Sequence, residues 1–62
     1  MTDFSAKELR LAAERELRRR LRDFPPKVAR HRMSKTDADL QIREMAAIVG
    51  RLMEAEAAER LV

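Results

Sequence analysis

Apolar residues in the first part of the chain recur at helical spacing. Five of them, three or four residues apart, form one stripe at about 100° per residue. They are Leu9, Ala13, Leu17, Leu21 and Phe24. Before this stripe, Ser5 and Glu8 have the spacing of a capping box, and Phe4 is placed for a hydrophobic staple. Because proline disfavours helical backbone in the residue before it, Pro25 and Pro26 are expected to end the helix, which is predicted over residues 6–24.

The second part begins with residues 26–32, where Pro26 favours one further helical turn. Ser34 is a second candidate N-cap, with Asp37 three residues later. Beyond it, apolar residues recur in alternating steps of four and three, as in a heptad seam. They are Ala38, Ile42, Met45, Val49 and Leu52. No proline interrupts residues 35–61, and the pattern predicts a second, longer helix there.

Two helices joined by about ten residues are expected to fold back on each other, so the predicted fold is an all-α antiparallel helical hairpin. We expect one helical-hairpin domain over residues 1–62. At 1.5 Å per residue the first helix is the shorter one and would end opposite about Leu52. Beyond that point the seam of the second helix becomes charged, at Glu56 and Glu59. Residues 55–62 are therefore expected to extend past the first helix.

Composition bears on how such a hairpin is stabilised. The chain has 62 residues, 40% of them charged, with no cysteine and one histidine, His31. A chain this short buries only about 60% of its unfolded surface, and natural chains of this size gain stability from disulfides, a metal or a partner subunit. The residue content excludes disulfides and a structural zinc site. We therefore expect a homo-oligomer, most simply a dimer, or a complex with a host protein.

Several function classes are not predicted. Residues 1–11 lack the apolar segment of a secretory signal, and the longest apolar run, residues 45–49, is too short to span a bilayer. We expect a cytoplasmic protein with no membrane role. A two-helix chain offers no enclosed pocket with converging polar groups. We therefore expect no enzymatic activity, with no catalytic residue, cofactor, metal or small-molecule substrate.

A series of short motifs runs through both predicted helices. They are Arg15-Glu16-Leu17, Arg20, Phe24-Pro25, Val28-Ala29, Arg32-Met33-Ser34, Ala38-Asp39, Ile42, Met45 and Ala47-Ile48-Val49. In these motifs the chain resembles a group of short, functionally unassigned helical proteins encoded in phages and prophages. Lys27 departs from that group's pattern, which has an aromatic residue there, and His31 stands where a small residue such as glycine is expected. The resemblance implies phage ancestry without a particular chemistry.

Charge is distributed unevenly along the chain. The net charge is −1 over residues 1–14, +7 over residues 15–35 and −3 over residues 36–62, so the turn end of the hairpin is predicted to be basic. Four arginines at i, i+3, i+4 and i+7 share the face opposite the apolar stripe, and two more lie in the turn. They are Arg15, Arg18, Arg19, Arg22, Arg30 and Arg32. This candidate basic face suits nucleic-acid phosphates, an acidic protein surface, or solvent, with partial pairing through Glu14–Arg18 and Glu16–Arg20.

A candidate apolar interaction surface lies away from the predicted seams, at Leu11, Leu40 and Ala47. Two functional hypotheses follow. In the first, the chain is a small non-enzymatic accessory protein that acts by protein–protein interaction, and the phage resemblance adds inhibition of a host defence complex. In the second, its arginines bind the backbone of nucleic acid without sequence preference. Base stacking is not expected, because both phenylalanines are predicted in the core.

Overall fold

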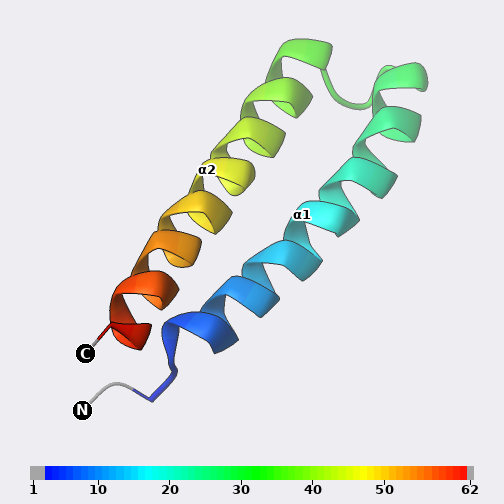
Figure 1. The fold of residues 1–62 in the computed structure, drawn as a ribbon. Coiled ribbons are helices and arrows are strands. Elements are labelled where there is room, and N and C mark those ends of the chain that lie inside the picture. The colour runs from blue at the N-terminus through cyan, green and yellow to red at the C-terminus, as the bar shows by residue number, and fades with distance from the viewer. Residues whose placement is uncertain (1–2, 62) are drawn as a thin grey trace.

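Two helices make up almost all of the chain that the structure describes. The computed structural model describes residues 3–61, with α1 at Ala6–Ala29 and α2 at Lys35–Arg60. The helices pack side by side in opposite directions, and the segment 30–34 joins them at one end (Figure 1). The predicted all-α antiparallel hairpin is confirmed.

The start of each helix is fixed by a capping serine. In α1 the Glu8 backbone N–H donates to Ser5 Oγ at 3.1 Å, and the Ser5 N–H donates to the Glu8 carboxylate at 3.5 Å, which completes the predicted capping box. In α2 the Asp37 N–H donates to Ser34 Oγ at 3.0 Å. Both acidic residues lie in a first turn, where the helix dipole favours negative charge. The predicted starts of both helices are confirmed.

The predicted end of the first helix is wrong. α1 continues through both prolines to Ala29, so it does not stop near Phe24 and no separate turn forms over residues 26–32. The reason lies in tertiary packing, because Phe24 is only 4% exposed and Val28 is half-buried. Keeping the backbone helical presents both side chains to α2. This burial outweighs the two helical hydrogen bonds that the prolines cannot donate.

α1 ends in a Schellman motif around His31. The His31 N–H donates to the Val28 carbonyl at 3.0 Å, and the Arg32 N–H donates to the Lys27 carbonyl at 2.8 Å. These are the two hydrogen bonds of that motif. His31 has a φ of 58°, in the left-handed region that favours glycine. A glycine would adopt this conformation with less strain.

The core between the helices is narrow. A cluster of Ala13, Met45 and Val49 forms its centre, with Leu17 and Leu52 packed against it. None of the side chains in residues 3–61 is completely shielded from solvent. The heptad seam predicted for α2 is confirmed by this cluster, since its residues are buried or half-buried in the expected order.

The seam of α1 differs from the predicted stripe. Leu9 and Leu21 are 43% and 52% exposed, so their assignment to the core is wrong. A spacing of four residues drifts by about 40° per step around a helix, and a run of such steps leaves the interface at both ends. The residues that face α2 alternate in steps of four and three instead. They are Ala6, Arg10, Ala13, Leu17, Arg20 and Phe24.

The end of α2 does not extend past α1, contrary to prediction. Glu56 is only 7% exposed, and the Arg10 side chain donates to its carboxylate across the interface. The Ala6 N–H donates to the Glu59 carboxylate at 3.3 and 3.4 Å. Because α1 has 24 residues and nearly matches the 26 of α2, the helices cover each other along their whole length. Residue 62, the last of the predicted overhang, lies outside the described residues.

Candidate interaction surface

One stripe of α1 points away from α2. It begins at Leu11 and continues with Arg15, Arg18 and Arg22, in steps of four, three and four. Leu11 lies two residues before the buried Ala13, which places it about 200° around the helix from the seam. All four side chains are exposed. We refer to these four residues as the outer stripe.

Two arginines of the predicted basic face are paired with carboxylates of the same helix. Arg19 donates to Glu16 at 2.8 Å, and Arg22 donates to Asp23 at 2.9 Å. The hydrogen bond from Arg19 lowers the pKa of Glu16 to about 2, and the one from Arg22 holds the pKa of Asp23 below its usual range. The same bonds raise the pKa of both guanidinium groups. Part of the positive charge is therefore balanced on the helix itself.

One of the two predicted intrahelical pairs forms. Arg20 Nε donates to Glu16 at 3.3 Å, as predicted. Glu14 instead pairs with Arg10 at 2.8 Å, so the predicted Glu14–Arg18 pair is wrong. Arg10 lies in the seam between two carboxylates, Glu14 on its own helix and Glu56 on α2, and it draws Glu14 toward the interface.

Four of the six candidate arginines make no ion pair within residues 3–61. Two of these, Arg15 and Arg18, are neighbours on the outer stripe. The other two, Arg30 and Arg32, lie in the connection between the helices. All four are exposed, and the ion pairs of the described chain involve other residues. Their guanidinium groups can therefore meet an external anion.

Two other arginines have structural roles that the apolar pattern did not predict. Arg20 Nη1 donates to the Gln41 carbonyl of α2 at 2.8 Å, and Arg10 binds Glu56. A signal for both does exist in the sequence. Arg10 lies three residues before Ala13, and Arg20 lies four residues before Phe24, so both continue the four-and-three spacing of the seam.

A shallow apolar hollow lies at the N-terminal end of the outer stripe. Its volume is about 390 Å³, and it is lined by Phe4, Glu8, Leu9, Leu11, Ala12 and Arg15. Phe4 is 59% exposed and Leu11 is 38% exposed. Exposed aromatic and aliphatic side chains beside an arginine are typical of protein interfaces.

The other two residues of the predicted apolar surface lie elsewhere. Leu40 and Ala47 each follow a buried residue of α2, Ala38 or Met45, by two positions, so they project from the outer side of that helix. The outer sides of α1 and α2 face opposite directions. The structure therefore does not bring Leu11 together with Leu40 and Ala47.

Clusters that could bind a metal and stretches that could span a membrane are both absent from the described residues. Within residues 3–61, no group of three or more histidine, cysteine, aspartate or glutamate side chains could hold a metal ion. Neither α1 nor α2 has a stretch both apolar and long enough for a membrane span. No protein-family model, curated protein or solved structure matches the chain, so the resemblance to phage-encoded proteins stays a prediction.

Proposed function

We propose that this chain is a non-enzymatic interaction module that binds an acidic surface of another protein through the outer stripe and the hollow beside it. The main support for this proposal is the position of Leu11, which lies in one line with Arg15 and Arg18. A phosphate-binding surface needs cations, whereas exposed Phe4 and Leu11 gain little from a sugar–phosphate backbone. Apolar anchors next to arginines are characteristic of the residues that dominate binding energy in protein complexes.

The charges indicate the chemistry of the partner. Arg15 and Arg18 are exposed about one helical turn apart, and each guanidinium can hold a carboxylate through two parallel hydrogen bonds. A segment with two acidic side chains flanking one apolar side chain would complement these arginines and Leu11. If the chain is phage-encoded, as its resemblance implies, the partner is a host protein. Binding and inhibition of a host defence complex is the most specific form of this proposal.

Capture from a host lysate tests the proposal when matched variants are compared. The full chain is immobilised as the natural sequence, as Leu11→Glu, as Arg15→Glu/Arg18→Glu, and as the control Arg43→Glu/Arg51→Glu. The control makes the same charge change on the outer side of α2. We expect a protein that the natural chain and the control retain, and that both outer-stripe variants lose by at least about tenfold. Equal retention by the Leu11→Glu chain, with its helicity intact by circular dichroism, would contradict the proposal.

A second candidate function is binding of nucleic acid without sequence preference. It is favoured by the four arginines that make no ion pair among the described residues. Binding to a short DNA duplex at two salt concentrations tests it, since the logarithm of the affinity falls by about 0.9 per phosphate contact for each logarithmic step in salt. Arg15→Glu/Arg18→Glu should abolish this binding, and Leu11→Ser should leave it unchanged. Absence of binding at low salt would eliminate this function.

A further inference from the structure

One flank of the hairpin carries apolar residues that are exposed or only half-buried beside the seam. Three residues on each helix follow one another in steps of four and seven, which keeps them on one side of that helix. They are Leu17, Leu21 and Val28 on α1, and Ile42, Ala46 and Met53 on α2. Leu21 and Met53 are 52% and 54% exposed. We refer to these six residues as the flank face.

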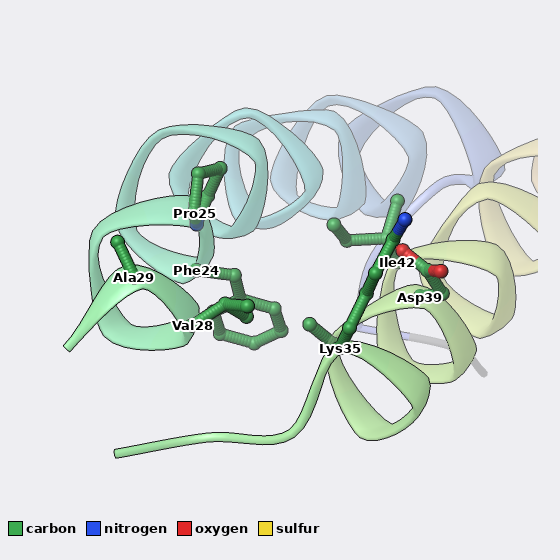
Figure 2. A pocket seen from close by; sticks show the side chains of 8 residues that line it. Phe24, Pro25, Val28, Ala29, Lys35, Asp39 and Ile42 are labelled. Carbon is green, nitrogen blue, oxygen red and sulfur yellow. The ribbon is translucent and has the colours of Figure 1, made fainter. Parts of the chain in front are cut away.

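A groove near the turn shows that the two series lie on the same side of the hairpin. It has a volume of about 340 Å³, and Val28 of α1 and Ile42 of α2 both line it. Figure 2 shows the Phe24 ring and Val28 pointing from α1 toward Lys35 and Ile42 of α2. Most of its lining is apolar. The groove can therefore receive an apolar side chain from outside.

Within residues 3–61, the opposite flank offers no comparable apolar face. Leu9 and Ile48 are exposed there, by 43% and 47%. Polar residues occupy the next positions on the same side of each helix. Glu16 lies seven residues after Leu9, and Gln41 lies seven residues before Ile48. Glu16 is engaged by Arg19 and keeps its charge, because its pKa is lowered to about 2. A partner is therefore expected to cover the flank face and not this side.

Charge complementarity favours a second copy of the chain in the reverse direction. The half of the hairpin next to the turn, residues 18–47, has nine basic and four acidic residues. The other half, residues 1–17 and 48–62, has five basic and seven acidic residues. Two antiparallel copies bring the basic half of one against the acidic half of the other at both ends. A parallel pair would bring like charge against like charge, which opposes association.

The dimensions of the hairpin fit the same arrangement. It measures 48 × 17 × 16 Å, and a side of 48 by 17 Å is comparable to the roughly 800 Å² that each partner contributes to a standard interface. Ala46 lies seven residues from Asp39, which lines the groove, and seven residues from Met53. A two-fold axis at Ala46 therefore places Met53 of each copy opposite the groove of the other.

We infer that two copies of this chain form an antiparallel dimer through the flank face, with Met53 of each copy in the groove of the other. The four helices then share an apolar interface built from the same residues of both copies, as two-fold symmetry requires. The small side chain of Ala46 lets the two α2 helices approach closely at the axis. The outer stripe stays exposed in this dimer, so the dimer and the proposed function can each fail without the other.

Sedimentation of the full chain over a range of concentrations tests the dimer. The natural sequence should sediment with twice the mass of one chain. Met53→Glu should raise the dimer dissociation constant at least about tenfold, because the dimer would transfer a carboxylate from water into a groove whose lining is mostly apolar and includes the like charge of Asp39. Ile48→Glu is the matched control, since Ile48 has a similar exposure on the opposite flank, and it should leave the dimer intact. A natural chain that is monomeric at every concentration, or equal effects of the two variants, would overturn the inference.

Single cysteines test the orientation without adding charge. The natural chain has no cysteine, so an introduced thiol reports on its own position. Ala46→Cys should form a disulfide-linked dimer on mild oxidation, because a disulfide needs Cα atoms within about 7 Å and position 46 lies at the proposed axis. Ala47→Cys, on the outer side of α2, should remain largely unlinked. Equal cross-linking of the two variants, or faster cross-linking at position 47, would rule out the antiparallel arrangement.

Discussion

The two ends of the hairpin are held together by different interactions. At the turn end, Phe24 and Ala38 are each only 4% exposed, and both line the same mostly apolar groove. At the open end, the side chain of Arg10 donates to Glu56. The Ala6 N–H donates to the Glu59 carboxylate there. Apolar burial depends little on pH or salt, whereas ion pairs depend on both. One end of the hairpin is therefore fixed by packing, and closure of the other end depends on charge.

This difference also indicates how the register of the two helices is specified. An apolar seam with a heptad spacing can pair after a slip of seven residues, since similar side chains meet again. Arg10 and Glu56 can meet in one register only, because a slip would leave a nearly buried carboxylate without its partner. Polar pairs inside a seam are best known for this role in fixing register. We therefore expect the open end to contribute alignment more than overall stability.

The largest expected effect comes from removing the apolar contact at the turn end. Phe24→Ala should cost about 3–5 kcal/mol of unfolding free energy, since the side chain is almost completely buried. A chain of this size has roughly that much stability in total, so the variant should be largely unfolded at 25 °C. Circular dichroism with urea titration measures this. Leu40→Ala, an exposed position on α2, is the control and should keep its helicity; similar urea midpoints for the two variants would contradict the packing argument.

A smaller effect is expected from separating the charges at the open end. Glu56→Leu leaves the Arg10 guanidinium at the interface without its main carboxylate, and the melting temperature should fall by several degrees. The double variant Arg10→Leu/Glu56→Leu should recover most of this loss, because a buried ion pair can be replaced by apolar side chains without a net penalty. Thermal melts of the three chains test the prediction. A double variant less stable than Glu56→Leu would show that the two side chains do not act as a pair.

The charge dependence of the open end should appear as acid sensitivity. Hydrogen bonds from arginines lower the pKa of Glu56 and of Glu16 in the folded chain, that of Glu16 to about 2. As the pH falls, these two carboxylates are therefore protonated in the unfolded chain before they are protonated in the folded chain. Their contribution to stability is fully present above the usual pKa of 4.5, and it is lost as the pH falls toward the folded pKa. The urea midpoint of the natural chain should be lower at pH 3 than at pH 7. In Glu56→Gln this difference should shrink; an unchanged difference would exclude Glu56 as a source.

Local rules were enough to predict much of this fold. The caps at Ser5 and Ser34 and the seam of α2 depend on residues within a few positions of one another. The end of α1 could not be predicted in that way. Its continuation through Pro25 and Pro26 depends on the burial of Val28, together with Phe24, beside residues of α2 that are far away in the sequence.

The candidate surface was predictable to a similar degree. Helical spacing placed the arginines of α1 on one face, and the structure keeps Arg15 and Arg18 exposed there. Spacing alone could not show that Glu14 turns to Arg10 and leaves Arg18 without an ion pair among the described residues. The partner of Glu14 depends on the position of Arg10, which also binds a carboxylate of α2. The separation of Leu11 from Leu40 likewise depends on how the two helices pair, which spacing within one helix does not determine.

The smallest expected effect concerns the chain reversal at the turn end. His31 has a φ of 58° at the C′ position of the Schellman motif, where a side chain with a Cβ is strained. His31→Gly should relieve this strain and raise the unfolding free energy by about 0.5–1 kcal/mol, after the greater freedom of glycine in the unfolded chain is counted. For a domain this small, such a gain raises the melting temperature by roughly 2–8 °C. His31→Ala retains the Cβ and should melt close to the natural chain. Equal stabilisation by alanine and glycine would show that the histidine ring, and not its backbone conformation, limits stability at the turn.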